Sequence, residues 1–539
     1  MSRLYYNGDI ITMCSKDDKP SAIVTQNDEI VYVGDYETAR NTYKEAEMVN
    51  LDGKTIMPGF IDPHSHFFQT AQSINMCDLS EASSFADIVD ILNLYKEEHK
   101  DAEIIFASGY DHNFLIEQSH PDMTVLDLVS DTIPIYISHV SGHMGVANSA
   151  LLKMAGITDE TKDPKGGRFG RYDDGRPDGY VEEIPALMQI IAPAMKLIKT
   201  DMPSQIKKAQ QLYFKYGVTT VQEGAASKQA AIGLAALAKN GLIDIDVVMY
   251  IMDEDYADIA QQMHEYTVGK YVNHIKIGGS KIILDGSPQG KSAWLSTPYE
   301  NEKEYCGYAS HDLEYVVKAC RKAIKGRYQI LAHCNGDAAS EQFISAYQIA
   351  VKKEGSDNEI RPVMIHCQTV RDDQLDRMAE VGMIPSIFVG HIYFWGEVHK
   401  KNLGINRAER ISPVRSALER GLIYNFHQDT PVTKPDMLHS VWCAVNRVTR
   451  NGDVLGNKQC IDVYDALKGV TINAAYEYHE ENIKGSIETG KKADFAILSD
   501  NPLKADPKKI KDIQVVRTVK AAVDTNQRTN IQITTTTEI

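Results

Sequence analysis

The stretch Met57-Pro-Gly-Phe-Ile-Asp-Pro-His-Ser-His66 closes a short apolar run with two histidines, His64 and His66. If this run is a β-strand, residues i and i+2 lie on the same face, so both imidazoles can converge on one metal ion while Ser65 points away. A single His-x-His pair is weak evidence, because it can equally be two polar residues at the end of a strand. Its interpretation therefore depends on the rest of the chain.

Three further apolar runs end in histidine or aspartate. They are residues 328–333, ending at His333, residues 362–366, ending at His366, and residues 422–429, which contain His427 and end at Asp429. Longer amphipathic stretches lie between the runs, such as residues 313–325, 374–381 and 407–420. Strands that alternate with helices of this length predict βα units and a parallel sheet. In barrels of such units the catalytic residues lie at the carboxyl ends of the strands.

The number of expected strands predicts a closed barrel. We expect strands near residues 56–62, 218–223, 243–252, 275–284, 328–333, 363–366, 383–389 and 423–426. These eight strands indicate an α/β fold, a (β/α)8 TIM barrel. The candidate ligands then belong to strands one, five, six and eight, all at the same end.

A chain of 539 residues is longer than a bare barrel of about 250, so further modules are expected. Short alternating runs in residues 1–55 and 484–539 predict one small β-sandwich built from both chain ends, because so small a sheet is marginal alone. The barrel domain then spans residues 56–483. Within it, residues 67–216 are too long for a simple βα connection. We expect them to form an inserted cap or lid, with helices near residues 84–99 and 206–216.

Composition restricts the class of protein. The formal net charge of −17 argues against nucleic acid or an anionic membrane as the partner and mainly implies solubility. The expected partner is a small-molecule substrate. Eight cysteines without a C-x-x-C pair predict reduced thiols. No apolar run approaches 18 residues, and the first residues lack the apolar region of a secretion signal. These features predict a cytoplasmic protein and leave open whether it forms a homo-oligomer.

Several motifs together resemble a known family. Three of them look like the metal-dependent amidohydrolase superfamily: the stretch that ends at His66, Thr471-Ile-Asn-Ala-Ala, and Gly485-Ser-Ile-Glu-Thr-Gly-Lys-Lys-Ala-Asp494. Others resemble the amidohydrolase-3 branch of this superfamily: Gly142-His143 with Asn148-Ser149, Lys281-Ile-Ile-Leu-Asp-Gly-Ser, and Val389-Gly-His-Ile-Tyr-Phe-Trp-Gly. That branch includes N-substituted formamide deformylases and proteins labelled exoenzyme regulators. The resemblance covers essentially the whole chain.

The resemblance implies a metal centre with one or two Zn²⁺ ions, or other divalent metals. His64 and His66 would bind one ion, and His333 and His366 a second. Lys281 would bridge them as a carbamate formed with carbon dioxide, because a protonated ammonium has no lone pair to offer a cation, whereas a carbamate is an anionic oxygen donor. Lys276, five residues earlier, faces the opposite way on a regular strand and is the competing position. If Lys281 is unmodified, a single-metal site of His64, His66 and His366 is the alternative.

Asp429 completes the implied ligand set and is the candidate general acid and base. The alternative is an aspartate that merely begins the turn Asp429-Thr-Pro-Val. The resulting expectation is a metal-dependent hydrolase of carbon–nitrogen bonds other than peptide bonds, acting on N-substituted amides or formamides through metal-activated hydroxide. An esterase or lactonase with the same centre, and a non-catalytic regulator on this fold, are the alternatives.

Five residues are candidates for substrate contact. They are His143, Asp285, His391, Tyr393 and Trp395. Asp285 would shape the floor of the substrate site, and the aromatic residues after strand seven would favour an apolar N-substituent. Ordinary loop packing and a hydrogen-bonded loop histidine are the competing interpretations.

Overall fold

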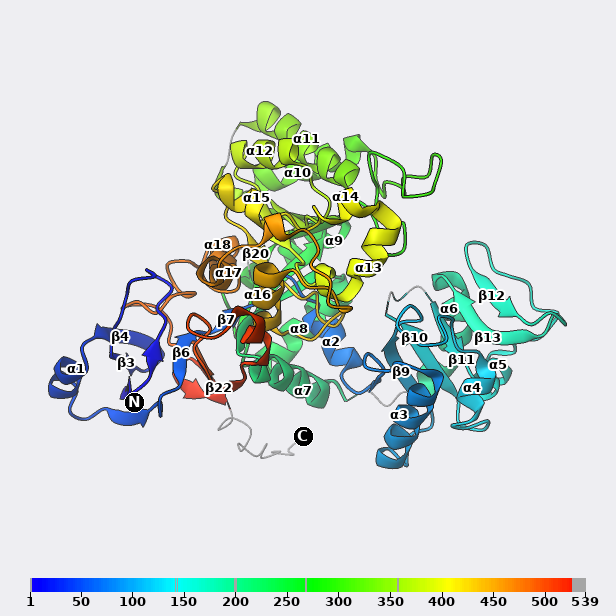
Figure 1. Ribbon diagram of the computed structural model, residues 1–539, viewed down its shortest axis with the longest axis horizontal. Coiled ribbons are helices and arrows are strands. Elements are labelled where there is room, and N and C mark those ends of the chain that lie inside the picture. The colour runs from blue at the N-terminus through cyan, green and yellow to red at the C-terminus, as the bar shows by residue number, and fades with distance from the viewer. Residues whose placement is uncertain are drawn as a thin grey trace. The chain divides into compact units, whose positions relative to one another are not determined.

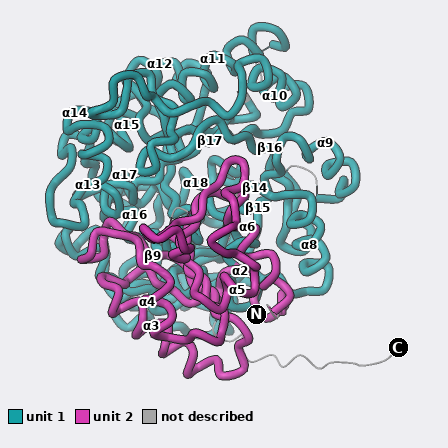
Figure 2. Tube along the Cα trace, turned by 90° about the vertical axis from the view of Figure 1, so that its right-hand side faces the viewer, with its two compact units in different colours: residues 1–70, 206–539 teal, residues 71–205 magenta. Residues whose placement is uncertain are grey.

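The computed structural model describes residues 2–140, 142, 144–197, 201–266, 269–355 and 358–525. The chain divides into two compact units, residues 1–70 with 206–539, and residues 71–205 (Figure 2). The candidate ligands of the predicted metal centre all belong to the first unit.

The first unit is organised around an eight-stranded sheet whose neighbouring strands are all parallel and follow chain order. Helices lie around this part of the chain in Figure 1. The strands of the sheet are β7 (Phe60–Ile61), β14 (Val218–Ala226), β15 (Asp246–Met252), β16 (Ile275–Ile283), β17 (Gln329–Cys334), β18 (Val363–His366), β19 (Ile384–Ile387) and β20 (Asn425–Phe426). Most of their residues are buried, as expected for parallel strands covered by helices. The expected set of strands is therefore present in the predicted order, in a TIM-barrel-like α/β fold.

Helices connect these strands. They include α8 (Lys228–Lys239), α9 (Asp253–Gln262), α10 (Leu313–Gly326), α11 (Asp337–Glu354), α12 (Asp372–Glu380) and α13 (His391–Leu403). The helix expected at residues 407–420 is instead two short helices, α14 (Ile405–Ala408) and α15 (Val414–Glu419). Pro413 stands directly before α15, where its fixed φ and missing N–H suit a helix start and not a helix interior.

Backbone hydrogen bonds connect the segments that follow the two outer strands of the sheet. The Asp429 amide donates to the His64 carbonyl at 3.2 Å, and the His66 amide donates to the Thr430 carbonyl at 2.8 Å. The segments after β7 and β20 are therefore held side by side, so residues from both ends of the sheet reach the same place.

The strand expected at residues 56–62 is wrong in one respect. It is broken at Gly59 into β6 (Thr55–Pro58), which pairs with β21 (Phe495–Leu498), and β7, which pairs with β14. A Cβ atom at Gly59 would lie 2.6 Å from the side chain of Thr219, so the close approach of the chains requires glycine. His64 and His66 consequently lie beyond the strand, and strand alternation does not explain how they converge.

Two smaller sheets are built mainly from the chain ends. One contains β4 (Glu29–Gly34), β3 (Ala22–Gln26), β1 (Ser2–Tyr6) and β5 (Glu47–Asn50), and the other contains β2 (Asp9–Ile10), β6, β21, β22 (Val515–Lys520) and β23 (Val523–Asp524). Buried residues from both ends, including Tyr5, Ile23, Phe495 and Ile497, form one apolar core. The second sheet thus combines strands separated by more than 400 residues of sequence.

The second unit has its own sheet, in the order β12 (Arg168–Arg171), β13 (Pro177–Glu182), β11 (Met144–Ala147), β10 (Ile135–His139), β9 (Ile105–Tyr110), β8 (Cys77–Asp78). The helix expected at residues 84–99 is α3 (Phe85–Glu98), which begins where the Ser84 hydroxyl accepts a hydrogen bond from the Asp87 amide. The other expected helix is α7 (Met202–Lys215), which lies mostly in the first unit. Whether residues 67–216 act as a lid stays a prediction.

A buried network of charges lies at the amino ends of the barrel strands. Asp246, at the start of β15, lies 2.6 Å from the ammonium groups of both Lys484 and Lys520. Lys276 forms an ion pair with Glu480 at 2.7 Å. These ion pairs connect the chain after α18 (Ile472–Glu477), at Glu480, Lys484 and Lys520, to the amino ends of β15 and β16.

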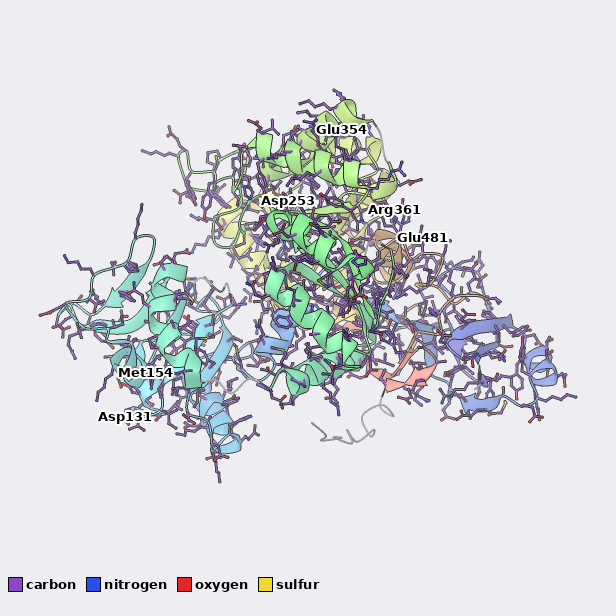
Figure 3. The ribbon with its side chains drawn as sticks, turned by 180° about the vertical axis from the view of Figure 1, so that it is seen from behind. Asp131, Met154, Asp253, Glu354, Arg361 and Glu481 are labelled. Atoms are coloured by element: carbon purple, nitrogen blue, oxygen red, sulfur yellow. The ribbon has the colours of Figure 1, made fainter. Side chains whose placement is uncertain are left out.

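A further ion pair, between Arg361 and Glu481, joins the same regions nearer the surface. The Arg361 guanidinium donates to both carboxylate oxygens of Glu481, at 3.1 and 2.8 Å, and Figure 3 shows the two residues side by side. This two-pronged geometry fixes orientation as well as distance. It attaches the segment that enters β18 to the chain after α18 (Ile472–Glu477).

Among the described residues, no helix is long and apolar enough to cross a membrane. The eight cysteines are all unpaired.

The buried network generates a stability prediction. We expect Asp246→Asn to lower the free energy of unfolding by about 3–5 kcal/mol, because it leaves two buried ammonium groups without their shared carboxylate. Urea denaturation at neutral pH measures this. Asp376→Asn is the matched control: Asp376 pairs with Arg420 at the surface and is 61% exposed, so a loss of under about 1 kcal/mol is expected.

The same carboxylate gives a pH dependence. Burial alone would raise the pKa of Asp246, but Lys484 and Lys520 hold it well below the ordinary aspartate value. Its contribution is therefore complete above the unfolded-state pKa and is lost as the pH falls toward the folded-state pKa. The stability difference between wild type and Asp246→Asn should shrink as the pH is lowered below about 4. A difference that stays constant down to pH 2 would contradict this account.

Candidate metal centre

Three histidines converge on one carboxylate at the carboxyl end of the eight-stranded sheet. The Nε2 atoms of His64 and His66 lie 3.5 and 3.2 Å from Asp429 Oδ1, and His366 Nε2 lies 3.9 Å from Asp429 Oδ2. Ligands of one Zn²⁺ ion, each about 2.0–2.2 Å from the metal, stand at about these separations. The donor atoms of His64, His366 and Asp429 all lie within 4.8 Å of one another, which is close enough to share an ion.

The backbone at two of these residues is in an uncommon conformation. His366 has φ 70° and Asp429 has φ 56°, both in the left-handed region that few residues other than glycine adopt. Such a conformation costs about 1–3 kcal/mol and persists only where the surrounding structure imposes it. In this conformation the side chains of His366 and Asp429 lie where their donor atoms and that of His64 converge.

Gln222, on β14, fixes the orientation of His64. Its Oε1 atom lies 2.6 Å from His64 Nδ1. An amide oxygen can only accept, so Nδ1 carries the proton and Nε2 keeps its lone pair. The lone pair of His64 therefore faces Asp429 and the other histidines, as a metal ligand requires.

A chain of polar residues orients His366 in the same way. His366 Nδ1 lies 3.2 Å from His427 Nε2, and His427 Nδ1 lies 3.0 Å from the Ser386 hydroxyl. If each Nδ1 is the donor, the chain ends on the Ser386 oxygen and His366 Nε2 is free to bind a cation. Burial lowers the pKa of His427 to about 3, so this residue is neutral and suited to that relay.

Asp285 orients His333, at the end of β17. Its Oδ1 atom lies 3.2 Å from His333 Nδ1 and accepts from the Asn335 amide at 3.0 Å. Its Oδ2 atom accepts from the backbone amides of Gly336 and Trp294. The His333 and His366 rings are 4.5 Å apart. The predicted substrate residue Asp285 thus contacts a histidine of the centre, and its contact with substrate stays a prediction.

The two candidate lysines have different surroundings. Lys276 lies near the amino end of β16, where it pairs with Glu480 and donates to the Tyr478 carbonyl at 2.9 Å. Lys281 lies toward the carboxyl end of the same strand and is 2% exposed. Within the described part of the chain, its ammonium nitrogen has no hydrogen-bond partner. Burial lowers the pKa of Lys281 to about 8.

The charge states of the cluster suit a cation. Burial and the charge of Lys281 hold the pKa of His64 well below its ordinary value, and burial does the same for His366. Burial alone would raise the pKa of Asp429, but the close imidazole of His66 keeps it well below its ordinary value. These two neutral imidazoles and the ionised carboxylate can bind a divalent ion directly. Burial alone would lower the pKa of His66, but Asp429 raises it, so His66 has to lose its proton when an ion binds.

Of the remaining predicted substrate residues, two lie near His366 and one packs against a different helix. His391, the first residue of α13, is buried with its ring 6.0 Å from that of His366, and Trp395 packs against His391 at 5.3 Å. Tyr393 instead packs against His439 and Trp442 of α16 (Met437–Asn446). His143 lies outside the described residues. Contact of any of these with substrate stays a prediction.

Gln222, Ser386 and Glu223 were not singled out from the sequence. Glu223 is buried beside His66, and its carboxylate accepts from the Phe68 amide at 2.6 Å. The available signal was the pair Gln222-Glu223, two adjacent polar residues within the buried strand β14. Ser386 gave no such signal, since serine is common in strands and turns alike.

Comparison with known proteins identifies the family. A family model described as "Amidohydrolase family" (Amidohydro_3) matches residues 47–522. The chain belongs to this amidohydrolase family. The family indicated by the sequence motifs is thereby confirmed.

Two relatives and one solved structure extend the comparison. The amidohydrolase is 23% identical to the N-substituted formamide deformylase of Arthrobacter pascens, over 97% of this chain and 98% of the relative. It is 24% identical to the exoenzymes regulatory protein AepA of Pectobacterium carotovorum, over 74% and 86%. Its fold matches an uncharacterized metal-dependent hydrolase from Pyrococcus horikoshii with a TM-score of 0.76 and 24% identity, covering 94% of this chain and 99% of that one.

The orientation of His64 by Gln222 generates a prediction about metal affinity. We expect Gln222→Leu to weaken binding of the tightest ion by about 10–100-fold, because residues that orient a ligating histidine have effects of this size. Competition with a chromophoric chelator, on protein whose folding is verified by circular dichroism, measures the affinity. Gln211→Leu, on the exposed face of α7, is the control and should bind as wild type does. Equal affinity in both variants would show that Gln222 does not support the centre.

Proposed function

We propose that this amidohydrolase cleaves the carbon–nitrogen bond of a small N-substituted amide, such as a formamide, with one or two divalent ions, Zn²⁺ being the expected ion. The observation that carries the proposal is the convergence of His64, His66 and His366 on Asp429 at distances of 3.2 to 3.9 Å. A relative named as an N-substituted formamide deformylase supports the choice of amide.

The donor set fits divalent ions. His64, His66 and Asp429 would hold one ion, and His333 and His366 a second, with Lys281 between the two groups in its carbamylated form. Imidazole and carboxylate donors suit Zn²⁺ and neighbouring transition ions. Bound there, such ions would polarise the amide carbonyl and favour the ionisation of water.

Asp429 is the proposed proton carrier. Its carboxylate is ionised, as its lowered pKa indicates, and it lies where the histidines converge. It can accept a proton from the attacking water as the new carbon–oxygen bond forms. It then returns that proton to the amine nitrogen as the carbon–nitrogen bond breaks, which releases the amine and a carboxylic acid.

Lys281 is the proposed site of the carbamate. A neutral amine attacks the carbon of CO₂, an N–C bond forms, and one proton leaves the nitrogen. A pKa of about 8 leaves far more neutral amine near pH 8 than an ordinary lysine has. Lys276 is less suited, because its nitrogen is already engaged by Glu480 and the Tyr478 carbonyl.

The lysine assignment gives a direct spectroscopic prediction. In ¹³C-bicarbonate, we expect wild type and Lys276→Arg to show a protein carbamate resonance by ¹³C NMR, and Lys281→Arg to lack it, because a guanidinium does not form this adduct. Lys281→Arg should also lose metal relative to Lys276→Arg in elemental analysis. A resonance that survives in Lys281→Arg but disappears in Lys276→Arg would reverse the assignment.

The reaction itself is tested by substrate class. Metal-loaded wild type should hydrolyse members of a panel of N-alkyl and N-benzyl formamides faster than matched formate esters and lactones. Asp429→Asn should lower kcat roughly 10²–10⁴-fold, the usual contribution of a positioned acid–base group. Residual metal is measured in the same samples, since Asp429 is also a ligand.

Three outcomes of that panel separate the alternatives. Preference for the amides supports the proposal, and preference for esters or lactones overturns the amide assignment while it retains the hydrolytic centre. Full metal content without turnover of any compound would favour a non-catalytic role, as the name of the AepA relative suggests for that protein.

A further inference from the structure

A second cluster of metal-binding residue types lies in the unit of residues 71–205. Asp111 and His112 directly follow β9, and His139 is the last residue of β10. The two strands are parallel neighbours, with Tyr110 paired to His139. Because the carboxyl ends of parallel neighbours lie at one edge of a sheet, residues far apart in the sequence meet there.

The three side chains present one donor atom each to a common point. His112 Nδ1 and His139 Nε2 are 3.1 Å apart, His139 Nε2 and Asp111 Oδ1 are 3.4 Å apart, and His112 Nδ1 and Asp111 Oδ1 are 3.8 Å apart. Three ligands at about 2.0–2.1 Å from a tetrahedral ion stand about 3.3–3.4 Å from one another. The observed triangle matches one face of such a site.

A hydrogen-bonded network is the competing explanation. A hydrogen bond between the two imidazoles accounts for their separation of 3.1 Å. An N–H on His139 Nε2 that is shared between His112 Nδ1 and Asp111 Oδ1 would also bring those two atoms to 3.8 Å from each other, so counting bound ions decides between a network and a bound ion. A shared cation accounts for all three approaches at once.

The surroundings hold the triangle in place. The backbone and side-chain amides of Asn113 both donate to Asp111 Oδ1 at 2.9 Å, which fixes the carboxylate. The His120 ring stacks on the His112 ring at 4.0 Å, and its Nδ1 lies 3.0 Å from the Tyr110 hydroxyl. Such outer contacts orient metal ligands in known sites.

Burial also favours an ion-binding site. Asp111 and His139 are nearly covered, whereas the side chain of His112 is 27% exposed. The two covered residues supply a preformed base, and the exposed one leaves a route by which an ion can enter. Two imidazoles and one carboxylate are a donor set suited to Zn²⁺ and its neighbours in the first transition row.

We propose that Asp111, His112 and His139 bind one divalent transition ion, Zn²⁺ being the expected ion, independently of the ligands on the barrel strands. The site is formed within residues 71–205 and goes beyond the proposed amide hydrolysis. It assigns this unit a metal of its own.

The test counts ions in the full-length chain. Wild type, His112→Ala and His99→Ala are stripped with a chelator, equilibrated with Zn²⁺ and analysed by plasma mass spectrometry. His99 is an exposed histidine of the same unit and serves as the matched control. We expect His112→Ala to bind about one ion fewer per chain than the other two, because three protein ligands define the site.

Both variants are also made in a His64→Ala/His66→Ala background, which removes the contribution of the barrel centre to the Zn²⁺ content. There, His99→Ala should keep an ion that His112→Ala lacks, and Zn²⁺ should raise the melting temperature only of the former. Equal Zn²⁺ content of wild type and His112→Ala would overturn the proposal, whatever the barrel variants show. If the His64→Ala/His66→Ala background instead kept the full Zn²⁺ content of wild type, that would count against the proposed metal centre of the hydrolase and not against this site.

Discussion

Two backbone hydrogen bonds, from the Asp429 amide to the His64 carbonyl and from the His66 amide to the Thr430 carbonyl, determine where the chemistry of this protein lies. They join the segments that follow the first and last strands of a parallel sheet. Without them, two of the histidines and the carboxylate would stand at opposite edges of the sheet. With them, the ligand cluster is assembled by backbone geometry, and each side chain needs only a modest further constraint.

Those further constraints come from residues that are not ligands. Gln222 fixes which nitrogen of His64 carries the proton, and Asp285 does so for His333, while the Ser386–His427 pair contacts His366 Nδ1 and leaves its Nε2 facing Asp429. The left-handed backbone at His366 and Asp429 turns the last two donors inward. Such a backbone conformation is unfavourable by itself and persists only because the surrounding structure imposes it.

The sequence predicted the strand order, and that His64, His66, His366 and Asp429 meet at one end of the sheet, because both depend on local patterns. Apolar runs that end in histidine or aspartate can be recognised without knowing what they pack against. It did not predict the break at Gly59, because that break depends on the side chain of Thr219, 160 residues away. Nor did it identify Gln222 or Ser386, whose roles arise only when neighbouring strands come into register. The cluster of Asp111, His112 and His139 escaped for the same reason, since its members meet only when β9 and β10 pair.

The two ends of β16 show how surroundings, and not residue type, decide what a buried lysine does. At the amino end, burial lowers the pKa of Lys276, but Glu480, which pairs with its ammonium at 2.7 Å, opposes that shift. Nearby Lys484, held by Asp246 and Glu480, has its pKa raised above the ordinary value although burial opposes this. Toward the carboxyl end, Lys281 is equally buried beside histidines, and the pKa falls to about 8. A carboxylate in direct contact favours the cationic form of a buried lysine, whereas Asp429 and Glu477 act on Lys281 without a hydrogen bond, and burial outweighs them. One strand therefore carries a paired lysine near its amino end and, toward its carboxyl end, a buried lysine whose ammonium nitrogen has no hydrogen-bond partner among the described residues.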